Sequence, residues 1–579
     1  MSHVEITLRS PYEPATDDTA LAHRRLPRNR NDLWAEVFVR ALVEQGLRAV
    51  CIAPGSRSTP LVMACAAQPE LRLFVHNDER GAAFFALGLA RASGQATAVI
   101  CTSGTAAANF LPAVIEAHMS ETPLLVLTAD RPPEAWDSGA NQTIDQLKLY
   151  GDAVRWHTLA PLPEASPSHA LLRAVQGIAT RAWMYAHAPL PGPVHVNFPF
   201  RKPLEPTDVP EDYTPDSLPK QSAARFIPGT LRPSAEQIHT LHHAIRSTPR
   251  GLIVAGPRTP PRARAALFAL ARHAGYPILA DALSNLRFGC APHEADVLLT
   301  AYDTYLQQPP GAPELILTLG DSPTSTAALN FLAHSEAERI AISPHVRWRD
   351  EHFRTTLFLW SDPAELLNAT LAHADDLQRD LAWLNAWQAA EDNARAAQPA
   401  IPEERYFARL LEVLPDNHWL FVGNSLPVRH LDRWARPTSR RLTVLANRGA
   451  SGIDGTLSTA LGMAAAGKPT TAVIGDLAFY HDMNGLLMLQ RYPHLPFRLV
   501  IINNNGGRIF ERLPIAQFFH DNHYAPNPAL LFVSPHGMTF EHAARQFGLS
   551  YQAVEDELAL TEALCDPRSP QVIEALVRP

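Results

Sequence analysis

The fold of this 579-residue chain is decided by the stretch TTAVIGDLAFYHDMNGLLMLQRYPHLPFRLVIINNNGG, residues 470–507. It begins and ends with short apolar runs rich in β-branched residues, TTAVI (470–474) and RLVII (498–502). The residues between these runs are typical of a helix. A strand, a helix and a second strand predict a βαβ unit with parallel strands.

A second unit of the same layout lies nearer the N-terminus. There ATAVI (96–100) and PLLVL (123–127) take the places of the two apolar runs, and a helical segment again lies between them. A small-residue helix precedes each unit, GLARASG (88–94) in one case and GMAAAG (462–467) in the other. The likeness indicates a duplicated α/β domain. Because any two βαβ units share this layout, an unrelated pair stays an alternative.

A third α/β region lies between the two units, with apolar runs at 251–257, 276–284, 315–321 and 339–343. Proline-rich and polar stretches near 203–235 and 391–404 separate the three regions. We therefore predict the α/β class with three open parallel-sheet domains. The predicted ranges are 1–30 for a loosely ordered N-terminal extension, and 31–205, 206–395 and 396–579 for the three domains.

Composition and charge exclude several classes of protein. The net charge of −8, from 50 basic and 58 acidic side chains, gives no reason to expect nucleic acid or an anionic membrane as a partner. The five cysteines are scattered without a CxxC pair, which fits a reducing compartment. Apolar runs stay short of the roughly 20 residues of a membrane span, and the first residues do not resemble a signal peptide. We expect a cytoplasmic protein without a membrane span.

The strongest local signal for chemistry lies at the ends of the two strands in residues 470–507. Gly475 and Asp476 follow the first strand, and Asn503–Asn505 with Gly506 follow the second. Ligands gather at such strand ends in open α/β sheets. A carboxylate oxygen, an amide oxygen and a main-chain carbonyl suit octahedral Mg²⁺ that also holds a diphosphate. We take Asn504 as the amide ligand, with its two neighbouring asparagines as alternatives; two ordinary polar turns are the competing interpretation.

A second signal is the glutamate in HNDERGAAFFALGLARASG (76–94). Glu79 stands just before a helix of small and apolar residues, so we expect its carboxylate to be partly buried at a domain surface. A buried carboxyl is unfavourable without a partner and is typical of functional sites. The ordinary alternative is that this residue caps the N-terminus of the helix.

Together these features resemble the thiamine diphosphate enzymes of the pyruvate decarboxylase and acetohydroxyacid synthase type. The resemblance is closest to the MenD family, whose members join 2-oxoglutarate to isochorismate. It runs over about residues 31–550 and is dense in the first and last domains but thin in the middle one. The motifs that carry it are APGSRSTPL (53–61), NDERGAAFFALGLA (77–90), CTSGTAAANFLPAVIEA (101–117), LTADRPPE (127–134), GANQTIDQ (139–146), GPVHVNFPFRKPLEP (192–206), GNSLPVR (423–429), NRGASGIDGTLSTALG (447–462), GDLAFYHDMN (475–484) and NNNGGRIFERLP (503–514).

The resemblance implies a transferase that needs thiamine diphosphate and Mg²⁺, with Mn²⁺ as an alternative metal. It implies decarboxylation of 2-oxoglutarate and addition of the resulting succinic semialdehyde carbanion to isochorismate, a step of menaquinone or phylloquinone biosynthesis. The first domain would bind the pyrimidine ring of the cofactor, and the last domain would bind its diphosphate. In this superfamily the active sites lie between subunits, so the resemblance implies a homodimer or homotetramer.

The family's residue roles carry over onto matching positions of this chain. Glu79 would be the catalytic residue, hydrogen-bonded to the pyrimidine ring, and Ile453 would prop the cofactor into its bent form. At the position of Leu477 the wider superfamily has glycine, whereas the MenD group has leucine, as this chain does. The implied cofactor-binding residues are Glu79, Ser425, Ile453, Gly475, Asp476, Leu477, Asn504, Ile509 and Phe510, and the implied metal ligands are Asp476, Asn504 and Gly506. The implied substrate-binding residues are Ser56, Arg57, Arg131, Asn141, Gln142, Ser425, Arg429, Arg448, Ile509, Phe510 and Leu513.

Four of the implied substrate-binding residues are arginines, and both implied substrates are dicarboxylates. Planar guanidinium groups match carboxylates bidentately, so several arginines are expected in such a site. One departure concerns the middle domain, where some relatives carry a basic pair and this chain reads SPTSTAALN (322–330). Arg287 is the residue that could compensate.

Two other functions stay open. A simple 2-oxo acid decarboxylase or an acetohydroxyacid synthase would act on substrates with one carboxylate, which the set of four arginines disfavours. A non-catalytic relative that binds the cofactor or a metabolite would be free to lose Glu79 or Asp476, and this chain keeps both.

Overall fold

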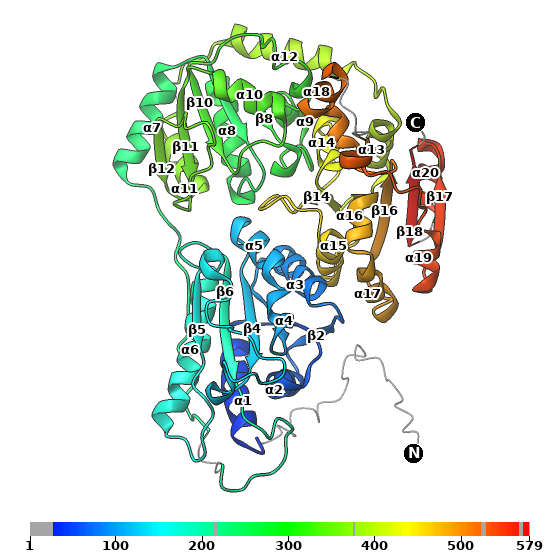
Figure 1. Ribbon diagram of the computed structural model, residues 1–579. Helices are drawn as coiled ribbons and strands as arrows, with labels where there is room; N and C mark the ends of the chain where they lie inside the picture. The colour runs from blue at the N-terminus through cyan, green and yellow to red at the C-terminus, as the bar shows by residue number, and fades with distance from the viewer. Residues whose placement is uncertain (1–26, 213–217, 375–376, 523–528, 567–570, 578–579) are drawn as a thin grey trace.

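A computed structural model describes residues 27–212, 218–374, 377–522, 529–566 and 571–577. Within them the chain forms three six-stranded sheets, with helices packed on both faces of each sheet (Figure 1). Every strand pairing described is parallel. The prediction of an α/β fold with three open parallel sheets is therefore confirmed. The predicted N-terminal extension lies almost wholly outside the described residues, which begin at 27.

The first and last sheets share one strand order, β2-β1-β3-β4-β6-β5 in the first and β14-β13-β15-β16-β18-β17 in the last. This shared order supports a duplicated domain over an unrelated pair of βαβ units. The first sheet contains β1 (Ala49–Ile52), β2 (Arg72–Val75), β3 (Thr97–Cys101), β4 (Leu124–Asp130), β5 (Trp156–Leu159) and β6 (Pro193–Pro199). The last contains β13 (His418–Val422), β14 (Leu442–Leu445), β15 (Thr470–Gly475), β16 (Phe497–Asn503), β17 (Tyr551–Val554) and β18 (Val572–Leu576).

Helices cover both of these sheets and carry several of the predicted site residues near their N-termini. The first sheet is covered by α1 (Arg30–Gln45), α2 (Thr59–Ala66), α3 (Glu79–Ser93), α4 (Thr105–Ala108), α5 (Leu111–Met119) and α6 (His169–His187). The last domain contains α13 (Pro402–Val413), α14 (Leu426–Trp434), α15 (Thr456–Ala465), α16 (Asp476–His481), α17 (Leu486–Arg491), α18 (Pro514–Asn522), α19 (Glu541–Gln546) and α20 (Glu557–Cys565). In both sheets the strand order reverses beside the first strand, which opens a crevice at the carboxyl ends of the strands.

The middle sheet has a different strand order, β12-β11-β10-β7-β8-β9. Its strands are β7 (Gly251–Ala255), β8 (Ile278–Ala280), β9 (Leu298–Leu299), β10 (Leu315–Leu319), β11 (Glu338–Ser343) and β12 (Leu357–Trp360), and its helices are α7 (Ala235–Ser247), α8 (Arg264–Ala274), α9 (Pro292–Ala295), α10 (Thr326–His334), α11 (Pro363–Leu371) and α12 (Leu381–Arg395). The strand order reverses between β7 and β10. There the following loops touch, because a Cβ added to Gly256 would lie 1.7 Å from the carbonyl oxygen of Asp321.

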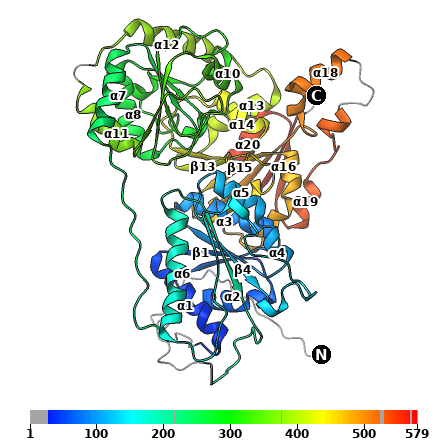
Figure 2. The same cartoon turned by 60° about the vertical axis from the view of Figure 1, so that its left-hand side comes forward.

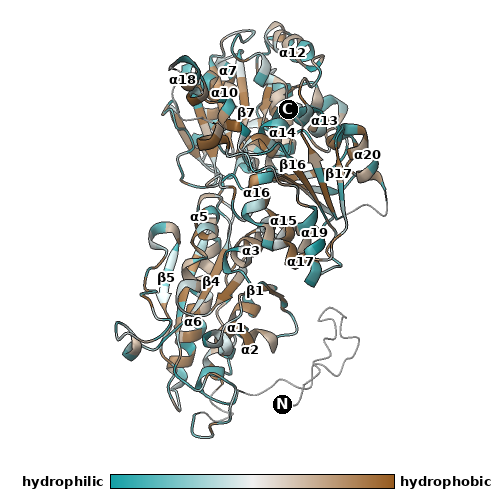
Figure 3. Ribbon diagram, turned by 45° about the vertical axis from the view of Figure 1, so that its right-hand side comes forward, coloured by the Kyte–Doolittle hydropathy of each residue, from teal (hydrophilic) through white to brown (hydrophobic). Residues whose placement is uncertain are grey.

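The first and last domains meet along α3 and α15, which lie side by side near the centre of the molecule (Figures 1 and 3). A Cβ added to Gly88 would lie 1.9 Å from the carbonyl oxygen of Thr459, and one added to Gly462 would lie 2.0 Å from that of Phe85. Only glycine allows two helix backbones to approach so closely. The buried apolar residues of both helices belong to one continuous cluster, so the two domains share a core.

An extended segment joins the first domain to the middle one and runs along one side of the molecule (Figure 2). Apolar residues lie along the strands of each sheet, and polar residues cover the outer faces of the helices (Figure 3). Among the described residues, we find no helix that is both long and apolar enough to cross a bilayer. Each sheet falls within one of the three predicted domain ranges, whose boundaries stay predictions.

Candidate active site

Asp476 and the turn after β16 lie together at the carboxyl edge of the last sheet. Asp476 is buried, and its Oδ2 accepts a hydrogen bond of 2.9 Å from the main-chain nitrogen of Gly506. Gly506 has a φ of +121°, and a Cβ there would lie 2.3 Å from the carbonyl oxygen of Val533. Glycine is therefore required at this position. This bond draws the turn that follows one strand onto the end of the neighbouring strand.

The three asparagines of this turn have different surroundings. The Asn503 amide nitrogen donates to Glu574 at 2.6 Å and to the carbonyl oxygen of Met538 at 2.9 Å. The Asn505 amide oxygen accepts from the main-chain nitrogens of residues 536 and 537. These two side chains thus hold neighbouring segments in place. The Asn504 nitrogen donates to Glu403 at 3.3 Å, and its amide oxygen has no partner among the described residues.

The surroundings of this turn fit a divalent cation that carries a diphosphate. Within the described residues, no three His, Cys, Asp or Glu side chains come close enough to hold a metal, so any cation here must also use amide and main-chain oxygens. A Cβ added to Gly475 would meet nothing within 4 Å, which leaves open space beside the main chain before Asp476. Half-buried Ile453 packs against the core shared by the first and last domains.

Glu79 begins α3 but does not cap it. The cap is Asp78, whose Oδ1 accepts from the main-chain nitrogens of Arg80 at 2.9 Å and Gly81 at 3.4 Å. The half-buried Glu79 side chain has no hydrogen-bond partner among the described residues. It faces the end of β3, where its charge adds to burial in raising the pKa of the Cys101 thiol. The carboxyl of Glu79 is therefore free to bind a ligand.

Two arginines lie at the carboxyl edge of the first sheet. Arg57 donates to the carbonyl oxygen of Phe200 at 2.8 Å, and Arg131 donates to the Ser103 hydroxyl at 2.6 Å. Burial and the Arg131 guanidinium lower the pKa of Arg57, and Asp130 offsets part of this effect. The Arg57 Nε is buried and has no partner among the described residues. This pair of cations therefore has spare donors for an anion.

A second pair lies at the carboxyl edge of the last sheet. Arg429 donates to the carbonyl oxygen of Ser425 at 2.8 Å, and Arg448 donates to the Asn424 amide oxygen at 3.1 Å. Burial and the nearby Arg448 lower the pKa of Arg429. Ser425 has a φ of +70°, a backbone angle that residues other than glycine rarely adopt. Such backbone strain is often retained at functional sites. Arg448 also lines a cavity of about 410 Å³ between the three domains.

These four arginines share one property. Each has a single side-chain hydrogen bond to the protein and, within the described part of the chain, no ion pair with a carboxylate. Other arginines of this acidic chain are neutralised; Arg349, for example, pairs with both Glu121 and Asp321. A guanidinium carries five N–H donors, so each of the four keeps most of its capacity for a ligand.

The remaining predicted residues are more exposed. Ser56, Asn141 and Gln142 are exposed, and Gln142 donates to the carbonyl oxygen of Ser103. Ile509 and Phe510 are half-buried after the Asn504 turn, and Leu513 is 41% exposed. The predicted residues thus form one cluster at the edge of the first sheet and another at the edge of the last. No hydrogen bond or ion pair among the described residues joins the two clusters directly.

Both ends of the chain match family models of thiamine-dependent enzymes. Residues 34–149 match the N-terminal TPP binding domain of thiamine pyrophosphate enzymes, and residues 429–574 match the C-terminal TPP binding domain. A protein of Roseiflexus sp. (strain RS-1) is 44% identical over 577 residues, covering 94% of this chain and 95% of that protein. Proteins of Halorubrum lacusprofundi and Chloroflexus aurantiacus are 44% and 41% identical, over 91% and 92% of this chain and 89% and 90% of their own lengths. All three are named 2-succinyl-5-enolpyruvyl-6-hydroxy-3-cyclohexene-1-carboxylate (SEPHCHC) synthase.

This chain belongs to the SEPHCHC synthase family. The MenD resemblance is thereby confirmed, and so is thiamine diphosphate as the cofactor. The two matched domains are those that carry the two clusters, Glu79 with Arg57 and Arg131 in one, and Asp476 with Asn504 in the other.

The idea that Arg287 supplies a substrate-binding cation in this SEPHCHC synthase family member is wrong. Its side chain is fully buried and pairs with Asp432 at 2.7 Å. It also donates to the carbonyl oxygens of Ala280, Asp432 and Ala435. A guanidinium enclosed in this way joins the middle domain to α14 of the last domain and cannot reach a substrate.

Three residues near the site were not among the predicted site residues. His536 contacts the Asp476 carboxylate through Nε2 at 3.1 Å, Asn424 holds Arg448, and Glu403 contacts Asn504. Asn424 lies inside the quoted GNSLPVR motif, which was a usable signal. Neither Glu403 nor His536 stands in a motif, so only the folded chain brings them to the site.

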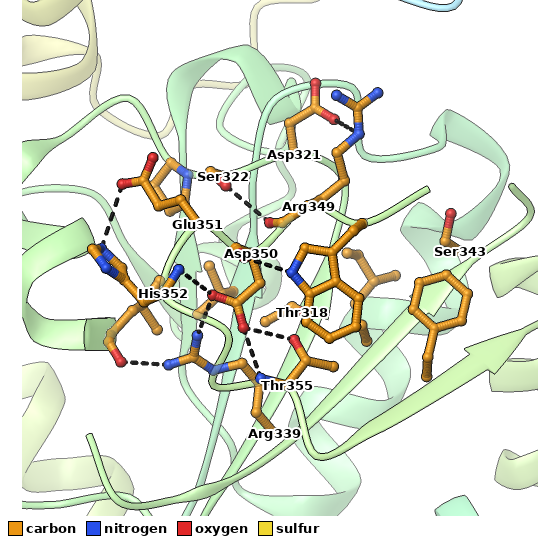
Figure 4. Close-up of a pocket in the computed structure, with 18 of the residues that line it drawn as sticks. Thr318, Asp321, Ser322, Arg339, Ser343, Arg349, Asp350, Glu351, His352 and Thr355 are labelled. Carbon is orange, nitrogen blue, oxygen red and sulfur yellow. Dashed lines mark hydrogen bonds and ion pairs between the residues drawn. The ribbon is translucent and has the colours of Figure 1, made fainter. Parts of the chain in front are cut away.

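The middle domain has a small cavity apart from these residues, at the carboxyl ends of β10 and β11 (Figure 4). The loop of residues 344–356 covers it and leaves a volume of about 50 Å³. Asp350 pairs with Arg339 across it and accepts a hydrogen bond from the Thr355 hydroxyl (Figure 4). Such a space holds a few water molecules.

Proposed function

We propose that this chain catalyses the SEPHCHC synthase reaction as a transferase of menaquinone or phylloquinone biosynthesis. It decarboxylates 2-oxoglutarate and adds the remaining four-carbon unit to isochorismate, giving 2-succinyl-5-enolpyruvyl-6-hydroxy-3-cyclohexene-1-carboxylate and CO₂. The observation that carries the proposal is the set of four arginines that the protein positions without neutralising. Two dicarboxylate substrates require such a set, whereas a pyruvate-type substrate with one carboxylate does not.

The last domain would anchor the cofactor through a metal. Asp476, Asn504 and the Gly506 carbonyl would hold Mg²⁺, or Mn²⁺ in its place, because they are hard oxygen donors on neighbouring strand ends, and the Gly506 nitrogen already donates to Asp476. The open space beside Gly475 would admit the diphosphate. Thiamine diphosphate, when bound, supplies the electron sink for the loss of CO₂. The apolar cofactor contacts would come from Ile453, Leu477, Ile509 and Phe510, with Ser425 as a polar contact.

The first domain would handle the proton. Glu79, which is free of capping, would hydrogen-bond the pyrimidine ring and keep a proton on its ring nitrogen. From the N-terminus of α3, Glu79 would orient the pyrimidine ring, and such orientation raises the effective concentration of the reacting groups.

The arginines would bind and orient the substrates. Arg57 and Arg131 form one pair, and Arg429 and Arg448 form the other. Each pair would donate hydrogen bonds to a substrate carboxylate, whose negative charge would offset the repulsion between the two guanidinium groups. The exposed Ser56, Asn141 and Gln142 would add hydrogen bonds, and Leu513 would cover the apolar part of the substrate. The two arginine pairs lie on different sheets, so the substrates would lie between a first and a last domain.

We further propose a cytoplasmic homodimer or homotetramer whose active sites lie at the subunit interface, with domains at 31–205, 206–395 and 396–579. Each cluster has unused donors or acceptors, and no direct hydrogen bond or ion pair joins the clusters within the described single chain. If a second subunit completed the site, the unused donors and acceptors of both clusters would face the same bound ligands.

One assay tests the reaction. The purified protein is incubated with 2-oxoglutarate with and without isochorismate, and with Mg²⁺ and thiamine diphosphate supplied or removed by chelation and dialysis. We expect CO₂ release and the joined product only when both substrates, metal and cofactor are present in full. Absence of a joined product would contradict the proposal, and equal turnover of pyruvate would favour a simple 2-oxo acid decarboxylase.

A further inference from the structure

Glu403 contacts the amide nitrogen of Asn504, the asparagine that we assign as a metal ligand. It stands in the first turn of α13, far in sequence from the Asn504 turn, and only 7% of its surface is exposed. Its Oε1 is 3.3 Å from the Asn504 amide nitrogen. Among the described residues Glu403 forms no ion pair, so its charge is not neutralised by an arginine.

The contact selects one orientation of the Asn504 amide. The oxygen and nitrogen of an amide have nearly the same size, and a rotation of 180° exchanges them. The carboxylate oxygen of Glu403 accepts this hydrogen bond, so the amide nitrogen faces Glu403. The amide oxygen must then point away, and this is the oxygen without a partner among the described residues. A reversed amide would present an NH₂ group to a cation.

The amides of Asn503 and Asn505 do not need Glu403 to fix their orientation. The Asn503 amide is fixed by Glu574 and by Met538, and that of Asn505 by two main-chain nitrogens. Both orientations are therefore already fixed by other groups. Asn504 depends on Glu403 alone among the described residues.

We propose that Glu403 is a positioning residue: by accepting the Asn504 N–H, it aims the Asn504 oxygen at the cation. The proposal rests on the metal site assigned under the proposed function. Outer hydrogen-bond partners of metal ligands typically change metal affinity by about 10–100-fold when removed. The negative charge of Glu403 would add an attraction for the cation, so hydrogen bonding and charge must be separated by experiment.

Mn²⁺ binding separates them, measured by electron paramagnetic resonance of free Mn²⁺ with the full-length protein and thiamine diphosphate present. Glu403→Leu removes both acceptor and charge, and we expect Mn²⁺ affinity to fall about 10-fold or more. Glu403→Gln keeps an acceptor but loses the charge, and we expect a fall of less than about 3-fold. Equal weakening by both variants would assign the effect to charge and overturn positioning, and no weakening by Glu403→Leu would also overturn it.

A second background distinguishes positioning from general damage. In Asn504→Asp both side-chain atoms are oxygens, so orientation no longer matters. We expect Glu403→Leu to weaken Mn²⁺ binding in the wild-type background but not in the Asn504→Asp background. Weakening by the same factor in both backgrounds would contradict the proposal, because a purely structural role of Glu403 predicts that outcome.

Two controls complete the design. Glu404→Leu removes a carboxylate of similar burial, 5% exposed, from the same turn. Its partners are Arg433, His430 and the Ala400 nitrogen, none of which is assigned to the metal, so Mn²⁺ affinity should not change. Asp476→Asn tests the metal site itself and should abolish tight binding. If Asp476→Asn binds Mn²⁺ normally, the assigned metal site is wrong, whereas a failure confined to the Glu403 variants refutes only the positioning role.

Discussion

At the scale of single residues, Asp78 and Glu79 are neighbouring acids with separable roles. Asp78 caps α3, and Glu79 is left without a partner among the described residues. We expect Glu79→Gln to lower turnover at least 100-fold while the free energy of unfolding stays nearly unchanged. Asp78→Ala should instead lower the free energy of unfolding by about 1 kcal/mol, the usual effect of losing an N-cap. Steady-state kinetics and chemical unfolding of both variants test the separation, and normal turnover of Glu79→Gln would remove its catalytic role.

The same residues show what sequence alone provides at this scale. The motif around Glu79 led to the right helix terminus, but the sequence could not decide which of two adjacent acids caps it. Likewise, three consecutive asparagines have the same chemistry in the sequence. Only their partners in the fold, Glu574, Glu403 and residues 536–537, distinguish them. Side-chain hydrogen bonds between distant segments decide such questions, and a local pattern does not contain them.

Asp482 gives a prediction for pH. It is fully buried beneath α15, accepts from the Ser458 nitrogen at 2.7 Å, and burial raises its pKa to about 7. The folded protein therefore holds this proton more firmly than the unfolded chain. The group stabilises the fold below pH about 4, and that contribution is lost as the pH rises through about 7.

The expected effect is measurable by chemical unfolding at pH 5 and pH 8. Asp482→Asn, which keeps an acceptor for Ser458 and cannot titrate, should lose this pH dependence, which amounts to about 3 kcal/mol between these two pH values. An unchanged difference between the two pH values in the variant would show that other groups are responsible.

At the scale of elements, α3 and α15 depend on glycine for their approach. An added Cβ at Gly88 would enter the α15 backbone, so Gly88→Ala should lower the free energy of unfolding by about 3 kcal/mol. Gly177 in α6 is the matched control, because a Cβ there would meet nothing within 4 Å. Gly177→Ala should stabilise by about 0.5–1 kcal/mol, the helix propensity of alanine over glycine. Thermal unfolding of both variants tests the contrast; equal effects would contradict the packing argument.

Helix α14 gives the second element-scale prediction. It carries Arg429 toward the site and Asp432 toward Arg287, one turn apart. Arg287→Met leaves a buried carboxylate unpaired, so we expect a loss of about 3–5 kcal/mol in the free energy of unfolding. The double variant Arg287→Met, Asp432→Leu should recover more than half of that loss, since neither charge is then buried alone. Additive losses in the double variant would mean that the pair is not the cause.

The elements themselves were largely predictable, and Arg287 shows why their contacts were not. The apolar runs at 96–100, 123–127, 470–474 and 498–502 became β3, β4, β15 and β16 nearly in full, because a buried parallel strand leaves a local pattern. Arg287 looked like a free cation because burial depends on the packing of the middle domain against α14. Such packing between domains has no local sequence pattern.

At the scale of the whole molecule, the placement of the two clusters predicts complementation between subunits. Glu79→Gln and Asp476→Ala each remove one half of the site and should be inactive alone. If a site combines the first domain of one subunit with the last domain of another, a mixed dimer has one intact site. Random pairing makes half of the dimers mixed, so co-expression should restore about a quarter of the active sites. The measurement is specific activity after co-expression, and no recovery would place each site within a single chain.

The α3–α15 contact also has a consequence for biosynthesis. Gly88 and Thr459 are 371 positions apart (459 − 88), so one partner leaves the ribosome long before the other exists. At typical translation rates the wait is roughly 20–75 seconds. During that time the nascent first domain presents an uncovered apolar helix face, which favours aggregation and chaperone binding. The yield of native enzyme in a cell therefore depends on how well this early intermediate is protected.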